Sequence, residues 1–455
     1  MFQPVIFREY DIRGVYNGEF DDAFAENLGR SYVVYMKEYA GNATPTVVLG
    51  HDARISSPPI VKALAKGITQ SGGNVIHIGL VTSPVCYFST FTVKGADGAI
   101  QVTGSHNPPE YNGFKVSVGK STIFGEEIQK LRRIMEKGQY LSGKGTESRI
   151  DIFPSYFEKY KQEFGTLKNV KVVLDCGNGA AGVVARGLFN AVGLSPTILF
   201  EEPDGRFPNH HPDPTVEKNL KALQAQVLKE GAVCGIGFDG DADRIGVVDH
   251  TGRMVYGDEL MVVISRDILS RDKGAKIVGD VKCSDRLFHD IEAHGGQPIM
   301  WKTGHSLIKE KIKVEKAPFG GEMSGHVFFA DRNFGYDDAP YAALRLAEIL
   351  SKTGKTIPEL LAGLPPAFNT PEIRVDTTEE KKLLIVQKMK EAFGNGGPDF
   401  KVNLIDGIRL SFNDGWALCR ASNTQPVLVL RYESNTQEGL NRIRNKVESV
   451  VNKYL

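Results

Sequence analysis

One pattern occurs three times along the chain: an apolar run, a polar loop, a helical segment and a second apolar run. Short apolar runs that alternate with helical patterns are typical of parallel α/β units. The sequence therefore predicts three related α/β domains, and no other feature constrains the fold as strongly. The first runs cover residues 46–52, 170–175 and 275–281, and the second runs cover residues 74–78, 196–200 and 298–301.

The chain has 455 residues, too many for a single core, so two to four domains are expected. Clustered proline and glycine in residues 363–371 end the third repeat, and softer boundaries fall at 143–148 and 250–253. The final segment does not repeat the unit and predicts strand, helix, strands and helix, with helices over Lys381–Phe393 and Gln437–Tyr454. The expected domains are residues 1–150, 151–252, 253–366 and 367–455.

Charge and cysteine content exclude several classes of protein. Lys plus Arg and Asp plus Glu number 55 each, which gives no support for a nucleic-acid or membrane surface, so an anionic ligand would be small. Five scattered cysteines without a C-x-x-C pair argue against disulfides or structural zinc and fit a reducing cytoplasm. The N-terminus does not read as a signal peptide and no long apolar run occurs, so we expect a cytoplasmic protein without a membrane span.

A polar turn, Thr103-Gly104-Ser105-His106-Asn107-Pro108, follows the apolar run 98–102. A hydroxyl held on such a turn can accept and return a group, so Ser105 is a candidate nucleophile. His106 is its neighbour, and Lys115 lies close enough in sequence to assist.

The loop Asp239-Gly240-Asp241-Ala242-Asp243-Arg244 lies between two apolar runs. Three carboxylates at alternate positions can converge on one hard cation such as Mg²⁺. An EF-hand is excluded, because Arg244 and His250 stand where that loop needs glycine and glutamate. A solvated acidic turn is the alternative.

Two further loops carry polar groups that suit a sugar phosphate. In residues 320–326, Glu322, Ser324 and His326 lie between glycines and could bind a polyhydroxyl ligand, although a generic glycine turn reads the same way. In residues 420–426, a guanidinium, two hydroxyls and an amide form a candidate phosphate cradle, with a capped turn as the alternative. The cradle residues are Arg420, Ser422, Asn423 and Thr424.

Other polar segments are less specific. Tyr10-Asp11-Ile12-Arg13-Gly14 and Lys302-Thr303-Gly304-His305-Ser306 are polar in unusual places. Residues 177–182 fit G-x-G-x-x-G after a strand, with Glu201 about 20 residues on, which leaves an NAD-dependent dehydrogenase as an alternative.

Taken together, the four loops resemble the α-D-phosphohexomutase superfamily, and Gly-Glu-Met-Ser-Gly-His at 321–326 resembles its phosphomannomutase/phosphoglucomutase group. The loops occur in the family's order and span nearly the whole chain. The resemblance implies three topologically similar mixed α/β sheet domains and a smaller α+β C-terminal domain around a central cleft. It also implies that Ser105 carries a phosphoryl group in the resting enzyme.

The resemblance further implies a mutase that interconverts hexose 6-phosphate and hexose 1-phosphate, of mannose and/or glucose, through a hexose 1,6-bisphosphate. Mg²⁺ would be held by Asp239, Asp241, Asp243 and an oxygen on Ser105. The other catalytic candidates are Arg13, His106, Lys115 and Arg244, with Lys115 the first choice for acid/base assistance. The substrate-binding candidates are Tyr10, Lys282, His305, Glu322, Ser324, His326, Arg420, Ser422, Asn423 and Thr424.

Other readings stay open at this point. A phosphoglucosamine mutase or a strict glucose-phosphate enzyme of the same family, a dehydrogenase, and a non-catalytic sugar-phosphate sensor are the rivals. The expected partners are small hexose phosphates, without nucleic acid or membrane, acting on a monomer or dimer.

Overall fold

The structure of the protein is a computed structural model that describes residues 3–423 and 425–455. The chain divides into two compact units. The first holds the residues up to Leu260 together with Ser324–Leu360, and the second holds Met261–Met323 and Leu361–Leu455.

The first sheet of the first unit is mixed. Strand β2 runs parallel to β3 and β4, whereas β5 is antiparallel to β4 and to β1. Its order is β1 (Ile12–Val15), β5 (Tyr111–Val118), β4 (Gly98–Val102), β2 (Thr46–His51), β3 (Asn74–Leu80) and β7 (Glu147–Arg149), and β6 (Ser121–Thr122) pairs with β5.

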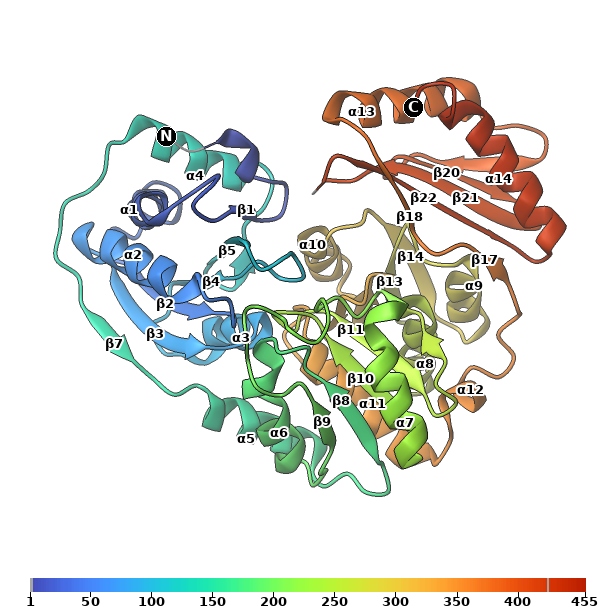
Figure 1. The fold of residues 1–455 in the computed structure, drawn as a ribbon, viewed down its shortest axis with the longest axis horizontal. Coiled ribbons are helices and arrows are strands. Elements are labelled where there is room, and N and C mark those ends of the chain that lie inside the picture. The colour runs from blue at the N-terminus through green and yellow to red at the C-terminus, as the bar shows by residue number, and fades with distance from the viewer. Residues whose placement is uncertain (1–2, 424) are drawn as a thin grey trace. The chain divides into compact units, whose positions relative to one another are not determined.

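Helices cover both faces of this sheet (Figure 1). One face packs against α1, α2 and α4, whose apolar side chains join those of β2, β4 and β5 in one buried core, while α3 lies on the other face. Asp21 caps α1 by accepting a hydrogen bond from the Phe24 N–H (2.8 Å), and Gly41 ends it in the left-handed region. The helices are α1 (Asp22–Ala40), α2 (Ser57–Gln70), α3 (Ser83–Thr92) and α4 (Glu126–Lys137), after the short η1 (Pro4–Ile6).

The second sheet repeats the strand order of the first. Strand β8 is parallel to β9 and β10, and β11 is antiparallel to β10. Its order is β12 (Met254–Val255), β11 (Ile245–Asp249), β10 (Cys234–Phe238), β8 (Val172–Asp175) and β9 (Thr197–Leu199). The associated helices are α5 (Phe153–Phe164), η2 (Ala180–Val183), α6 (Ala185–Ala191), η3 (Glu217–Leu220) and α7 (Lys221–Glu230), and the first unit also contains β16 (Val327–Phe329), α11 (Ala339–Thr353) and α12 (Ile357–Leu360).

The second unit contains the third repeat, in which β13 is parallel to both β14 and β15. The predicted first and second strands of all three repeats are therefore confirmed, and in each repeat the first strand lies between the second and the third. The special loops at Ser105, Asp239 and Glu322 each follow the third strand. The elements are β13 (Lys276–Asp280), β14 (Gln297–Trp301), β15 (Phe319–Gly321), α9 (Asp285–Ala293) and α10 (His305–Glu315), preceded by α8 (Gly257–Arg271).

The C-terminal segment forms the predicted α+β domain. Two helices, α13 (Glu379–Phe393) and α14 (Gln437–Val451), lie on one face of an antiparallel sheet and bury a core with it (Figure 1). Helix α14 ends three residues before the predicted Tyr454. The sheet order is β17 (Phe368–Asn369), β22 (Val427–Ser434), β21 (Gly415–Ala421), β20 (Ile408–Phe412) and β19 (Phe400–Asn403), and β18 (Ile373–Asp376) also pairs with β22.

The predicted linker at 143–148 is partly ordered into the first sheet. Gly145 approaches Gly73 so closely that a Cβ would lie 1.7 Å from the Gly73 carbonyl oxygen, and β7 then pairs with β3. Among the described residues all five cysteines are buried and none forms a disulfide. No helix in the part of the chain that the structure describes has both the length and the apolar character needed to cross a bilayer.

Candidate functional site

The serine turn joins β4 to β5 in the first unit. Ser105 has φ +50°, in the left-handed region that costs a residue with a Cβ about 1–3 kcal/mol, so its surroundings must hold it there. Its side chain is buried, and its Oγ donates a hydrogen bond to Asp239 Oδ2 (3.0 Å) and lies 3.1 Å from His106 Nδ1. The structure thus brings the predicted nucleophile against the predicted metal loop.

The metal loop joins β10 to β11. One oxygen each from Asp239, Asp241 and Asp243 lie within 4.8 Å of one another, and all three side chains are buried. The Oδ1 atoms of Asp241 and Asp243 make no hydrogen bond among the described residues. Buried carboxylate oxygens without a donor are costly unless a cation binds them, so this oxygen set fits a hard divalent ion such as Mg²⁺.

Lys115 on β5 holds the other oxygens of two of these aspartates. Its Nζ donates to Asp241 Oδ2 (2.6 Å) and to Asp243 Oδ2. Burial by itself lowers the pKa of Lys115, but the Asp241 and Asp243 carboxylates outweigh it and raise that pKa well above its ordinary value. This favours a permanent cation over a group that exchanges protons, and Lys115 is better suited to charge stabilisation than to acid/base work.

The aspartates do not behave alike. Burial, followed by the neighbouring Asp243 and Asp241 carboxylates, raises the pKa of Asp239 well above its usual range. Burial also acts to raise the pKa of Asp243, but the Lys115 ammonium outweighs it and the pKa of Asp243 is lowered. The aspartate beside Ser105 therefore binds a proton more readily than the one beside Lys115.

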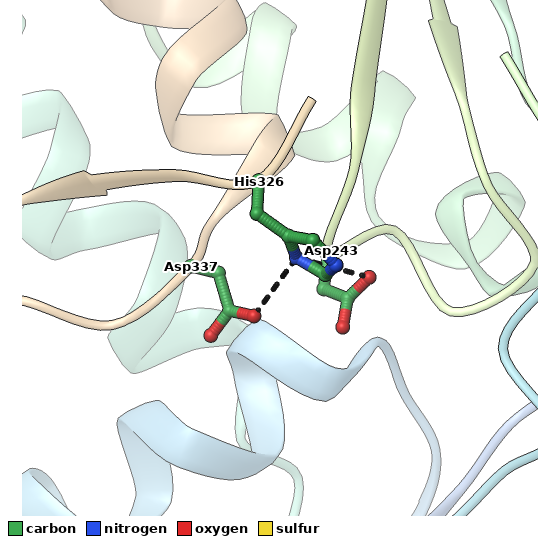
Figure 2. Close-up of side chains that lie close together, drawn as sticks. All are labelled: Asp243, His326 and Asp337. Carbon is green, nitrogen blue, oxygen red and sulfur yellow. Dashed lines mark ion pairs between the residues drawn. The ribbon is translucent and has the colours of Figure 1, made fainter. Parts of the chain in front are cut away.

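His326, predicted as a sugar-loop residue, lies against the metal loop (Figure 2). Its Nδ1 is 3.1 Å from Asp337 Oδ2 and 3.7 Å from Asp243 Oδ1, while its Nε2 accepts a hydrogen bond from Arg244 Nε (2.9 Å). Asp337 was not foreseen from the sequence, because it follows no motif and meets His326 only through the fold. Ser324 is half-buried two residues earlier.

Of the N-terminal candidates, Arg13 reaches the serine turn. Arg13 on β1 donates from Nη1 to Asn107 Oδ1 (2.8 Å) and pairs with Asp11, and Tyr10 is buried nearby in sequence. Burial, followed by the positive charges of Arg244 and Arg13, lowers the pKa of His106 well below its ordinary value. The His106 imidazole beside Ser105 is therefore neutral.

Two residues that the sequence did not single out anchor the serine turn. Asp52, directly after β2, accepts hydrogen bonds from Thr103 Oγ1 (2.8 Å) and the Gly104 N–H (3.2 Å). Arg54 donates from Nη2 to the Ser105 carbonyl oxygen (2.8 Å) and its side chain is fully buried. Asp52 and Arg54 could have been predicted from their position just beyond the carboxyl end of a central strand, where the ligand-binding loops of open α/β sheets lie.

In the second unit, Lys282 follows β13 and is buried. Its Nζ lies 3.2 Å from Glu372 Oε2 and 3.8 Å from Asp280 Oδ2. Burial lowers the pKa of Lys282, but the Glu372 and Asp280 carboxylates outweigh it and raise that pKa. Glu322 accepts a hydrogen bond from the Gly304 N–H (2.8 Å), which places its carboxylate at the start of α10, whose first residue is His305.

The predicted phosphate cradle also lies in the second unit. Asp406 Oδ2 accepts hydrogen bonds from Arg420 Nε (3.0 Å) and from the Thr303 N–H (3.0 Å), which links the cradle to the segment before His305. The Ser422 carbonyl accepts a hydrogen bond from Lys382 Nζ (2.7 Å). Asn423 is exposed, and Thr424 lies outside the described residues.

The glycine-rich turn at 177–182 is explained by close packing. A Cβ on Gly182 would lie 1.8 Å from the Glu201 carbonyl oxygen, and one on Gly179 would lie 2.8 Å from that of Gly240. The Ala180 N–H also donates to the Gly240 carbonyl (2.9 Å). These glycines support the metal loop, which leaves the dinucleotide interpretation without a specific observation.

Four models of phosphoglucomutase/phosphomannomutase domains match the chain in order. The alpha/beta/alpha domains I, II and III match residues 4–142, 154–252 and 256–368, and the C-terminal domain matches residues 372–450.

Full-length relatives give the same result. A phosphomannomutase/phosphoglucomutase from Pseudomonas aeruginosa is 45% identical over 98% of this chain and 96% of its own length. A phosphoglucomutase from Neisseria gonorrhoeae is 40% identical over 98% and 96%. The crystal structure of a phosphoglucomutase/phosphomannomutase family protein from Burkholderia thailandensis superposes with a TM-score of 0.92 at 39% identity, covering 100% of this chain and 98% of that one.

Proposed function

The chain belongs to the phosphoglucomutase/phosphomannomutase family, and from this premise we propose that it interconverts hexose 6-phosphate and hexose 1-phosphate through a phosphoryl group carried on Ser105. Mannose and glucose phosphates are the proposed substrates. One observation carries the proposal: the buried Ser105 hydroxyl lies within a hydrogen bond of Asp239, in the same cluster as Lys115 and the other two aspartates.

The reaction balances as two transfers between oxygens. In the first, the bond from phosphorus to Ser105 Oγ breaks as a bond to the free sugar hydroxyl oxygen forms, and the proton of that hydroxyl ends on Ser105 Oγ. The product is a hexose 1,6-bisphosphate. In the second transfer, the other phosphate of this intermediate passes to Ser105, which loses its proton to the departing sugar oxygen. The enzyme is restored and the phosphate has changed position.

The three aspartates of the metal loop would hold Mg²⁺ together with an oxygen on Ser105, as their convergence suggests and as do the Oδ1 atoms of Asp241 and Asp243, which are free of hydrogen bonds within the described part of the chain. When bound, the ion would supply electrostatic stabilisation of the charge on a transferring phosphoryl group. Lys115 pairs with Asp241 and Asp243, and it would hold these two carboxylates in place while it offsets charge at the same site. Arg13 and Arg244 would add positive charge close to His106, and the neutral His106 would orient the serine.

Substrate binding is proposed for both units. In the second, Lys282, His305 and Glu322 would bind sugar hydroxyls or the phosphate that is not transferred, and in the first, Tyr10, Ser324 and His326 would do so. The cradle of Arg420, Ser422, Asn423 and Thr424 would bind the distal phosphate, which a bidentate guanidinium suits. Each of the four proposed domains, at 1–150, 151–252, 253–366 and 367–455, carries one of the four loops.

Replacement of the serine tests the proposal. We expect Ser105→Ala to abolish conversion of mannose 1-phosphate and glucose 1-phosphate in a coupled assay, with an unchanged circular dichroism spectrum, because the carrier oxygen is gone. Intact-mass measurement should find one phosphate on the wild type and none on the variant. Normal turnover by Ser105→Ala would disprove the carrier role. Glucosamine 1-phosphate in the same assay would reveal a phosphoglucosamine mutase.

A further inference from the structure

Arg54 is a fully buried cation that no step of the proposed reaction uses. Its guanidinium donates to main-chain carbonyl oxygens of the serine turn and its edges: Ser105 (2.8 Å), Asn107 (2.6 Å), Pro108 (2.5 Å) and Tyr111 (3.0 Å). A planar guanidinium can offer five N–H donors in a fixed fork, which a lysine ammonium cannot reproduce. The main-chain carbonyl oxygens of the turn therefore converge on one charged group.

Asp52 fixes Arg54 and the turn together. Its Oδ2 accepts from Arg54 Nε (3.1 Å) and from Thr103 Oγ1 (2.8 Å), and its Oδ1 accepts from Ser57 Oγ (2.7 Å). Thr103 Oγ1 in turn accepts a hydrogen bond from the Ser105 N–H (2.8 Å). A continuous chain of hydrogen bonds thus runs from the end of β2 to the backbone of the candidate nucleophile.

The second repeat closes over the same guanidinium. The Phe207 ring lies 5.2 Å from Arg54 Cζ, within the range of a cation–π contact. Gly205 approaches so closely that a Cβ would lie 2.5 Å from Arg54 Cα. A Cβ on Gly240 would lie 2.4 Å from the Ser105 carbonyl oxygen, the same oxygen that accepts a hydrogen bond from Arg54. Arg54 and the metal loop therefore both contact the turn at this carbonyl.

The proposed reaction requires a serine turn that keeps its geometry while the charge on Ser105 changes. Under the proposed function, Ser105 alternates between a neutral hydroxyl and a phosphate with about −1.5 to −2 charge, while it stays in an unfavourable backbone conformation. A turn held only by its own hydrogen bonds would relax as that charge comes and goes. Carbonyl oxygens that all point to a fixed cation keep the opposite side of the turn, with Ser105 Oγ, directed at Asp239.

We propose that Arg54, anchored by Asp52 and covered by Phe207, is a positioning residue that holds Ser105 in register with the metal loop through both transfers. Arg54 touches main-chain atoms and none of the reacting atoms, so it acts on the phosphoryl-transfer step and little on sugar binding. The inference rests on the proposed function and adds the group that makes the nucleophile turn rigid.

The first test compares Arg54→Met and Arg54→Lys with the wild type. We expect kcat for glucose 1-phosphate to fall about 100-fold in both, since a shift of about 1 Å at a reacting atom has that effect, while KM stays close to the wild-type value. The lysine variant keeps the charge but not the fork, so it should not rescue. The control is Arg206→Met: Arg206 lies in the same segment as Phe207, its side chain is 74% exposed, and its loss should change neither constant.

A second pair avoids loss of the buried charge, in case the Arg54 variants do not fold. Thr103→Val removes the hydroxyl that links Asp52 to the Ser105 N–H, and Thr103→Ser keeps it. We expect Thr103→Val to lower kcat, and to slow rephosphorylation of Ser105 by glucose 1,6-bisphosphate measured by intact mass, and Thr103→Ser to restore both.

The outcomes separate the two proposals. Wild-type kcat in Thr103→Val and in a folded Arg54→Lys would overturn the positioning role and leave the mutase intact. A raised KM with an unchanged kcat would also overturn the positioning role, because it would place the effect of these substitutions on sugar binding. Turnover by Ser105→Ala, in contrast, would remove the proposed function itself.

Discussion

Lys115 is a buried cation that binds one carboxylate oxygen of each of two neighbouring aspartates and leaves the other oxygen available. Lys115 takes one oxygen from Asp241 and one from Asp243, and leaves the second oxygen of each without a hydrogen bond among the described residues. Asp239 instead accepts from Ser105. The same three carboxylates can thus stabilise the fold through Lys115 and still offer oxygens to a cation.

At this scale we predict the effect of magnesium on stability. Mg²⁺ should raise the melting temperature of the wild type, because a ligand of the folded state alone stabilises it by about 2.7 kcal/mol at a hundred times its Kd. In Asp241→Asn, one candidate oxygen ligand becomes an amide, and we expect less than half of the shift. Differential scanning calorimetry with Mg²⁺ or EDTA measures it.

The matched control is Glu217→Gln, which removes an exposed carboxylate of the same repeat and should keep the full shift. Equal magnesium shifts in the wild type and Asp241→Asn would contradict a metal site at this loop.

At the scale of elements, the start of α11 is held by an unusual cap. Asp338 accepts a hydrogen bond from the Tyr341 N–H (2.8 Å) and lies within reach of the hydroxyls of Tyr156 (3.3 Å) and Tyr160 (3.2 Å) of α5. Burial raises the pKa of Asp338 to about 7, and these hydrogen bonds only partly oppose it. The Asp338 side chain therefore connects α11 to α5, and its carboxyl group ionises only at a higher pH than usual.

This cap predicts a pH dependence of stability. Because the folded state binds the Asp338 proton more tightly than the unfolded state, the contribution of Asp338 is full below pH 4, is lost as the pH rises toward 7, and is constant above it. Asn is also a good N-cap and does not titrate. We expect Asp338→Asn to gain on the wild type between pH 4 and pH 7, on the order of a few kcal/mol.

Urea unfolding at a series of pH values measures this difference. Thr436→Ser, at the exposed cap of α14, exchanges one side chain that does not titrate for another and should leave the difference from wild type the same at every pH. A constant difference for Asp338→Asn as well would show that its ionisation does not depend on folding.

The sequence predicted the strands and loops better than it predicted the residues that contact the candidate site. The apolar runs before Ser105 and Asp239 predicted strands and loops correctly, because burial of both faces of a central strand leaves a continuous apolar pattern. Asp52, Arg54 and Asp337 were missed, since their roles depend on contacts between segments far apart in the chain. The first two residues of β7 were read as part of the linker at 143–148, because Glu147-Ser148-Arg149 is polar throughout and shows no alternation of apolar and polar residues.

At the scale of the whole molecule, both tryptophans, Trp301 and Trp416, belong to the second unit. There Arg409 is buried, stacks on Trp416 with Cζ 3.6 Å from the ring centroid, and donates to the Cys283 carbonyl (2.9 Å) and to Asp285 (2.7 Å). The C-terminal sheet is thereby joined to the segment after β13, and tryptophan emission reports on this unit alone.

We expect Arg409→Met to destabilise the second unit by about 3 kcal/mol, because it leaves buried acceptors without a donor. The midpoint of the tryptophan transition in urea should fall by more than that of far-ultraviolet circular dichroism, which averages over both units. Arg444→Met, at an exposed pair with Glu448, should change stability by less than about 1 kcal/mol. Equal shifts of both probes would mean that the two units unfold as one.

The five buried cysteines bear on how the molecule can be studied in motion. Burial raises the pKa of Cys86 and Cys234 to about 12, so these thiols are shielded from solvent and stay protonated. A single cysteine introduced on the surface of each unit would then react with maleimide dyes ahead of every native thiol. Site-specific donor and acceptor fluorophores could be attached without removing any native cysteine, and their energy transfer could be measured during turnover.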